Sequence, residues 1–169
     1  MTIDQDPPAL GEYEGHEIYP MPAFATISVT DVSRVAAWYE QALGFATVFR
    51  APDVDGQPSL VHLRRRKYQD LLLIPARVAA PSTDAPSSLT LSFNAEGEVD
   101  ALAERARTVE PLGRSSIMGP IDTPWNTRDV RVTDPAGHPL IFTGRNPKAD
   151  PEQLSRMRDM FGRQRVNKA

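Results

Sequence analysis

The sequence predicts an α+β protein in which two tandem βαβββ modules form a cup-shaped mixed sheet, and three observations support this prediction. The order strand, helix, strands occurs twice, and the second copy is offset from the first by about 64 residues. A segment rich in Pro and Ser at residues 81–86 has the composition of a linker between the copies. Neither copy could easily bury its sheet alone, so we expect the two sheets to combine in one domain.

The first module is expected over residues 23–80. Phe24–Val29 alternates in hydrophobicity with a period of two, as a half-buried strand does. Asp31 stands at a helix N-cap position, apolar residues follow at helical spacing, and Gly44 stands at the C′ position. Further strands are expected over 45–50, 59–65 and 70–74, with a turn at 53–56.

The second module is expected over residues 87–146. A strand over 88–93 precedes a helical stripe over 99–109 and a short strand around 115–118. Asp134–Gly137 fits a type I turn, with Pro at its second position and Gly at its fourth. Apolar residues alternate on both sides of this turn, which predicts a hairpin with one apolar face for a helix.

The two ends lie outside the modules. Residues 1–22 show no sustained period and are expected to form an extended arm, from which Tyr13, Tyr19 or Met21 could dock on a surface. Residues 150–165 are predicted to form an amphipathic helix that begins at Asp150. This helix could pack on the body or on a second subunit, or it could bind a membrane surface or a target.

Composition excludes several classes of function. The chain has 169 residues, a net charge of −3 and a sequence pI near 5.6, which gives no electrostatic footprint for nucleic acid. It has no cysteine, which excludes disulfides, thiolate nucleophiles and cysteine zinc sites. No apolar run approaches the length of a membrane span, so a cytoplasmic protein without a membrane partner is expected.

Three segments resemble the vicinal oxygen chelate superfamily, which includes glyoxalase I, extradiol dioxygenases, and fosfomycin- and bleomycin-resistance proteins. They are I-S-V-T-D at 27–31, W-Y-E-Q-A-L-G-F at 38–45 and P-W-N-T-R-D-V-R-V-T-D-P-A-G-H at 124–138. Together with the paired module order, the resemblance covers about residues 23–146. The Pro-Trp opening of the last segment looks most like the bleomycin-resistance branch.

The resemblance also implies where metal ligands would stand. Metal-dependent members carry a His before the helix-capping Asp, an equivalent ligand in the second module and a Glu after the D-P-x-G turn. The matching positions here are Phe24, Ser88 and Ile141, none of which is a His or a carboxylate. We therefore expect no metal and no cofactor.

The face of the sheet away from the helices is expected to line the cup with hydroxyls, charges and some apolar surface, as suits a drug-sized ligand. Its predicted lining is Phe24, Thr26, Ser28, His62, Arg64, Ser88, Thr90, Ser92, Asp129, Arg131, Ile141 and Thr143. All of these except Ser92 and Thr143, together with Trp125, are the candidate ligand-binding residues. No residue is assigned a catalytic role.

Several candidates have a second interpretation. Arg64 and Arg131 could instead pair with Asp70 or Asp129 and close the cleft. His62 could hydrogen-bond and pack, act as a general base, or bind a metal. Trp125 could stack on a ligand or pack beneath the hairpin.

Two further groups have mainly structural interpretations. The helical aromatic residues Trp38 and Tyr39 are expected in the core. The run Arg64–Lys67 is expected to be a solvated strand end, with anion binding as the alternative.

Taken with the resemblance, these features predict a metal-free protein that sequesters a drug-like or natural-product ligand, as in antibiotic resistance, without breaking a bond. The resemblance implies a homodimer with ligand crevices between subunits. One alternative is an enzyme on the same scaffold, either a metal-dependent lyase, isomerase or dioxygenase with displaced ligands or a metal-free acid–base catalyst. The other is an accessory subunit that has no ligand site.

Overall fold

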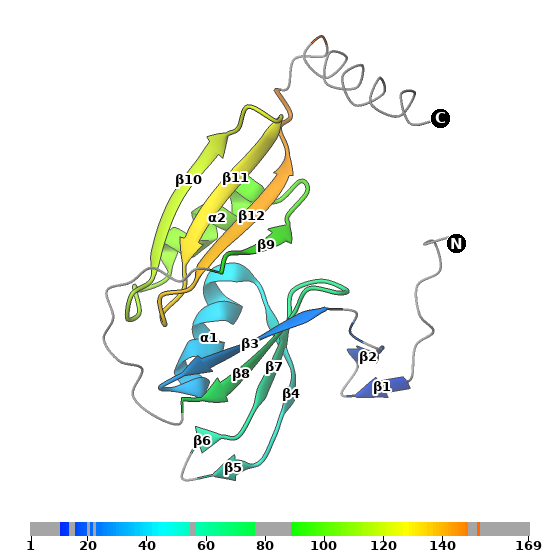
Figure 1. Cartoon of the computed structure of the whole chain (residues 1–169), viewed down its shortest axis with the longest axis vertical. Coiled ribbons are helices and arrows are strands. Elements are labelled where there is room, and N and C mark those ends of the chain that lie inside the picture. The colour runs from blue at the N-terminus through cyan, green and yellow to red at the C-terminus, as the bar shows by residue number, and fades with distance from the viewer. Residues whose placement is uncertain are drawn as a thin grey trace, which may run out of the picture.

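The computed structural model describes residues 11–13, 16–19, 21, 23–54, 57–76, 89–148 and 152 (Figure 1). The first module contains β3 (Phe24–Val29), α1 (Val32–Leu43), β4 (Ala46–Arg50), β7 (Val61–Arg64) and β8 (Asp70–Pro75). Two short strands, β5 (Asp53–Val54) and β6 (Gln57–Pro58), pair at the expected turn. The second module contains β9 (Leu91–Asn94), α2 (Val99–Thr108), β10 (Ser116–Asp122), β11 (Thr127–Thr133) and β12 (Pro139–Arg145).

The predicted α+β fold with tandem βαβββ modules is confirmed. Each module forms its own four-stranded sheet, in the order β3-β8-β7-β4 and β10-β11-β12-β9. Both sheets are mixed, because β3 pairs with β8 and β9 pairs with β12 in parallel while the other pairs are antiparallel. Figure 1 shows the two sheets one above the other along the long axis of the molecule.

The ends of α1 follow the predicted signals. The Asp31 carboxylate accepts a hydrogen bond from the backbone N–H of Arg34 at 2.8 Å, which satisfies one of the free donors of the first turn. At the other end, Gly44 has a φ of 70°, in the left-handed region that favours glycine. Both capping predictions are confirmed.

The hairpin turns where expected and is tied to α1. The Gly137 N–H donates to the Asp134 carbonyl at 3.0 Å, which closes the turn. The buried Asp134 carboxylate accepts the Tyr39 hydroxyl at 2.8 Å and the backbone N–H of His138 at 2.7 Å. Burial and the Asp134 charge raise the pKa of Tyr39 well above its usual value, so this phenol stays a donor.

One apolar core joins the two modules. It contains the inward faces of both sheets and the facing sides of α1 and α2. Trp38 and Tyr39 lie in it, as predicted, and are 5% and 0% exposed. Edge-to-face contacts continue from Tyr39 to Phe45 and on to Phe93 of the second module. The helices thus lie between the sheets, so the opposite face of each sheet points outward.

The basic run at residues 64–67 differs from the prediction, because Arg65 is not solvated. Its side chain is 3% exposed and donates to the carbonyls of Leu43 at 3.2 Å and Asn94 at 3.2 Å. It also pairs with Glu98 at 2.5 Å. Because Asn94 and Glu98 belong to the second module, Arg65 clamps the two modules together. Burial lowers its pKa, although the Glu98 carboxylate opposes this effect.

The described part of the N-terminal arm forms one strand pair and contacts the first module through Tyr19. β1 (Gly11–Tyr13) and β2 (His16–Ile18) pair as an antiparallel ladder, which the sequence did not predict. Tyr19 follows this ladder and is 5% exposed, so it docks on the body.

The linker at 81–86 and, apart from Glu152, the helix expected over 150–165 lie outside the described residues. No helix in the described ranges is long and apolar enough to cross a membrane.

Candidate ligand-binding site

The outward face of the first sheet is organised in rows that cross its strands. Phe24, Asp70, Arg64 and Ala46 are register partners on consecutive strands, and so form one row. Thr26, Leu72, His62 and Phe49 form the next row, and Ser28 lies beside Ile74. The opposite face packs against α1, so this concave face of the first sheet holds the side chains that the period of two predicted.

Asp70 is the centre of a polar network on this face. Its side chain is fully buried, and Oδ1 accepts hydrogen bonds from His62 Nε2 at 2.7 Å and Arg64 Nε at 2.8 Å. The Tyr19 hydroxyl of the arm donates to Oδ2 at 2.9 Å. The same hydroxyl accepts the backbone N–H of Tyr68 at 2.7 Å, and the Arg64 guanidinium lies 4.1 Å from the Tyr19 ring centroid.

This network holds Asp70 in its charged form. Burial opposes ionisation, but the hydrogen bonds from His62, Arg64 and Tyr19 and the Arg64 charge outweigh it and lower the pKa of Asp70 below its ordinary value. The structure therefore shows the alternative interpretation, in which Arg64 pairs with Asp70. Tyr19 covers this end of the face, so the Asp70 carboxylate has no solvent-exposed oxygen.

The outward face of the second sheet carries a different set of groups. Ser92, Ile141, Arg131 and Met118 form one row, and Asn94, Thr143, Asp129 and Ile121 form the next. Asp129 is buried and accepts the Thr143 hydroxyl at 2.7 Å. Arg131 is exposed and makes no ion pair with any residue that the structure describes. The alternative pairing of Arg131 with Asp129 is therefore not seen.

A hollow of about 460 Å³ lies on this second face. Arg131, Met118 and Ile141 line it, together with the hydroxyl-bearing residues Thr90, Ser116 and Thr133. Its volume is within the range of sites for drug-sized ligands. A cation, hydroxyls and apolar side chains thus converge on one concave surface.

Trp125 stands beside this face, in the loop between β10 and β11. It is 60% exposed, whereas its neighbour Asn126 is buried with a φ of 64°. The interpretation in which Trp125 packs beneath the hairpin is therefore wrong. Its indole ring is accessible to a ligand or a partner at the end of the second sheet.

Within one chain, the candidate residues fall into two groups on different sheets. Phe24, Thr26, Ser28, His62 and Arg64 lie on the first, and Thr90, Asp129, Arg131 and Ile141 lie on or directly before strands of the second. Ser88 is outside the described residues.

Sequence reasoning missed several exposed side chains on the same faces. Phe49 is 38%, Met118 61% and Ile121 43% exposed. Strand β4 shifts register between Thr47 and Phe49, and β10 shifts between Met118 and Ile121. A bulge changes which face the following residue points to, so simple alternation fails there. The sequence indicates Asp70 only as a possible ion-pair partner and Tyr19 only as a residue that could dock on a surface.

The positions that would hold a metal ion in metal-dependent relatives do not fit one. Phe24 and Ile141 lie on the concave faces and carry no donor atom. Among the residues that the structure describes, no three His, Cys, Asp or Glu side chains are grouped closely enough to bind a metal. We therefore derive no step through a metal.

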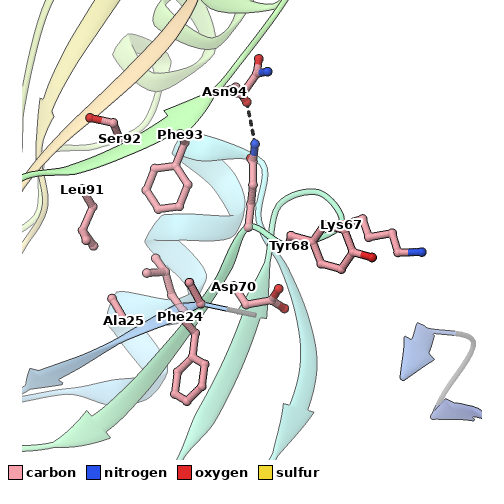
Figure 2. A pocket seen from close by; sticks show the side chains of 12 residues that line it. Phe24, Ala25, Lys67, Tyr68, Asp70, Leu91, Ser92, Phe93 and Asn94 are labelled. Atoms are coloured by element: carbon pink, nitrogen blue, oxygen red, sulfur yellow. Dashed lines mark hydrogen bonds between the residues drawn. The ribbon is translucent and has the colours of Figure 1, made fainter. Parts of the chain in front are cut away.

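A second hollow, of about 560 Å³, lies where the two modules meet (Figure 2). Phe24 and Ala25 of edge strand β3 line one side, and Leu91–Asn94 of edge strand β9 lines the other. Gln69 Nε2 spans the gap and donates to the Asn94 carbonyl at 2.8 Å. This second hollow lies between the edges of the two sheets and is separate from the hollow that Arg131 lines.

The two sheets, each backed by one helix, define a protein of the paired βαβββ class. Residues 22–142 match the sequence profile of the Glyoxalase/Bleomycin resistance protein/Dioxygenase superfamily. The chain therefore belongs to this superfamily, which confirms the resemblance. No curated protein matches the chain in sequence.

Solved structures support the same fold. TioX from Micromonospora sp. ML1 is 21% identical, with a TM-score of 0.56, covering 72% of this chain and 96% of its own. The bleomycin resistance determinant encoded on transposon Tn5 is 20% identical, with a TM-score of 0.56, covering 73% and 96%. TnmS3, an antibiotic binding protein from Streptomyces sp. CB03234, is 22% identical, with a TM-score of 0.53, covering 72% and 93%.

Proposed function

We propose that this chain is a cytoplasmic, homodimeric protein that sequesters a drug-like or natural-product small molecule without a metal. The ligand would lie between the first sheet of one chain and the second sheet of its partner. The observation that carries this proposal is that both concave faces are open in a single chain. The residues proposed to line the site are Phe24, Thr26, Ser28, His62, Arg64, Ser88, Thr90, Trp125, Asp129, Arg131 and Ile141.

The open faces support a dimer because they leave large apolar side chains in water. Phe24 is 51% exposed on the first sheet, and Met118 and Ile121 are exposed on the second. The helices already occupy the inner faces, and in the described part of the chain only Tyr19 covers part of an outer one. Large apolar side chains exposed on an open sheet face are often buried by a binding partner. A second copy brings the complementary sheet and turns two open faces into an enclosed cleft.

The side chains on these faces support binding more than catalysis. Asp70, the one acid on the described part of the first-sheet face, has both oxygens occupied by His62, Arg64 and Tyr19. The metal positions of the family hold Phe24 and Ile141. Two of the structures that share this fold are named for bleomycin resistance and for antibiotic binding, which is consistent with a sequestering role.

A second candidate function follows from one contact. His62 Nε2 lies 2.7 Å from Asp70 Oδ1, and the His62 side chain is 13% exposed. A carboxylate that orients a partly exposed imidazole is the usual arrangement of a general base. A metal-free acid–base enzyme on the same scaffold would use His62 in this way.

One experiment separates these functions. The full-length protein, purified without added metal, would be analysed by sedimentation velocity, by elemental analysis and by calorimetric titration with a panel of aromatic antibiotics. A dimer that binds a ligand saturably and returns it chemically unchanged supports sequestration. Conversion of the ligand that is lost in His62→Asn supports the enzyme. A monomer, or a stoichiometric metal, would contradict the proposal.

A further inference from the structure

We infer that the sequestered ligand carries an acidic group, such as a carboxylate or phenolate on a planar aromatic ring, which pairs with Arg131. This inference rests on the proposed function and names the class of its ligand. It follows from which charges on the concave faces are already neutralised and which are not.

The charges of the first sheet neutralise one another. Arg64 and His62 share Oδ1 of Asp70, and Tyr19 occupies Oδ2. Asp70 is the only acid on the described part of this face, and its side chain is fully buried. The first sheet therefore has no free carboxylate to offer to whatever faces it.

The charges on the outward face of the second sheet do not neutralise one another. The one acid on the described part of its outward face, Asp129, is buried and accepts the Thr143 hydroxyl. Arg131 is exposed in the hollow of about 460 Å³, and Arg145 is exposed further along the same face of β12. Neither guanidinium forms an ion pair with a described residue. The surface that would meet the ligand thus has an excess of positive charge.

Closing the cleft by dimer formation would bury this excess positive charge. When the first sheet of a partner covers the second, Arg131 loses water, and an unpaired cation in such a place is costly. The described part of the partner's first-sheet face brings no free carboxylate to pair with it, so the anion is assigned to the ligand. A guanidinium recognises a carboxylate with two parallel hydrogen bonds, and its flat face also stacks on aromatic rings.

The surroundings of Arg131 define the rest of the ligand. Met118 and Ile141 flank it in the same row, and both are apolar. Thr90, Ser116 and Thr133 supply hydroxyls around the hollow. An aromatic ring would pack on the apolar pair while its acidic substituent reaches the guanidinium. The carboxylates on the described part of the two faces, Asp70 and Asp129, are buried, so a cationic ligand would find no exposed acid there.

The test uses three probes that share a ring and differ in charge: 2-naphthoate, 2-naphthamide and 2-naphthylmethylammonium. Each would be titrated into the full-length protein by calorimetry at low salt. We expect 2-naphthoate to bind about fivefold tighter than 2-naphthamide, as one partly desolvated ion pair provides, and the ammonium compound to bind weakest. Arg131→Gln should remove the preference for 2-naphthoate over 2-naphthamide.

The matched control is Arg34→Gln, which removes the same charge from an exposed position on α1. It should bind all three probes as the unmodified protein does. If the ammonium compound binds tightest, or if Arg131→Gln retains the preference for 2-naphthoate, the inference is wrong while binding in the cleft stands. If no probe binds at millimolar concentration, both the inference and the proposed function are overturned.

Discussion

The carboxylates of Asp70 and Asp134 show how single residues are fixed by partners far away in the chain. Asp70 is bonded to Tyr19, which lies 51 positions earlier, and Asp134 is bonded to Tyr39, which lies 95 positions earlier. Both acids are almost completely buried, so each needs its donors to offset the loss of water. One anchors the arm to the first sheet, and the other anchors the hairpin to α1.

Asp70→Asn is expected to lower the free energy of unfolding by about 2 kcal/mol at neutral pH, because charged hydrogen bonds in a buried site are lost. The folded-state pKa of Asp70 lies below its ordinary value of 3.8, so its contribution is complete above that pH. It is lost as the pH falls through the folded-state pKa. The free energies of unfolding of the two proteins should therefore converge at strongly acidic pH, which urea unfolding between neutral and strongly acidic pH measures.

The control for this prediction is Glu104→Gln, which changes an exposed acid on α2. Its stability should follow that of the unmodified protein at every pH. A difference between Asp70→Asn and the unmodified protein that persists undiminished at the lowest pH would show that the charge of Asp70 is not what stabilises the fold.

At the scale of elements, the two modules are held together by more than apolar contact. Arg65, just after β7, reaches the carbonyl at the end of α1 and the carbonyl of Asn94 at the end of β9. Its guanidinium also lies 5.4 Å from the Phe142 ring centroid. A buried guanidinium with several acceptors fixes the angle between two elements more strictly than apolar packing does.

Arg65→Met is expected to destabilise the protein by about 3 kcal/mol, because it leaves the carbonyls of Leu43 and Asn94 without this donor. Arg66→Met is the matched control, since Arg66 pairs with the same Glu98 at 2.6 Å but is 38% exposed. It should cost less than about 1 kcal/mol. Chemical denaturation of the two variants gives the comparison, and equal losses would contradict the role of Arg65 as a clamp.

For the molecule as a whole, the main feature is that the helices are inside and the concave faces are outside. Figure 1 shows the two sheets in the upper and lower halves of the molecule, and they share no strand, so a single chain does not close a cup. Isolated sheets of this size are usually covered on one face and solvated on the other. Here the solvated faces carry Phe24 and Met118, and Trp125 is exposed in the loop between β10 and β11, which is why a partner copy is proposed.

Met118→Asp is expected to weaken the proposed dimer by on the order of tenfold or more, because a carboxylate would be buried against the partner's sheet. Since Met118 is 61% exposed in one chain, the stability of the folded chain should change little. The control is Ala101→Asp, an exposed position on α2. Sedimentation velocity over a range of protein concentrations measures both, and a fully dimeric Met118→Asp would place the interface elsewhere.

The sequence by itself determined the elements and their faces. The period of two along Phe24–Val29, the cap at Asp31, the left-handed residue at Gly44 and the turn at Asp134–Gly137 all depend on local backbone preferences. Such preferences are encoded within a few residues, so they could be predicted without knowing the fold. The same alternation also located most side chains on the concave faces.

Only the tertiary structure decided which charges on those faces are satisfied. Arg64 is neutralised by Asp70, the Arg65 side chain is buried, and Arg131 forms no ion pair with a described residue. These facts depend on distances between side chains, most of them from different strands. The docking of Tyr19 and the bulges in β4 and β10 depend in the same way on packing between distant segments. Side-chain pairing follows from three-dimensional proximity, which no local pattern in the sequence encodes.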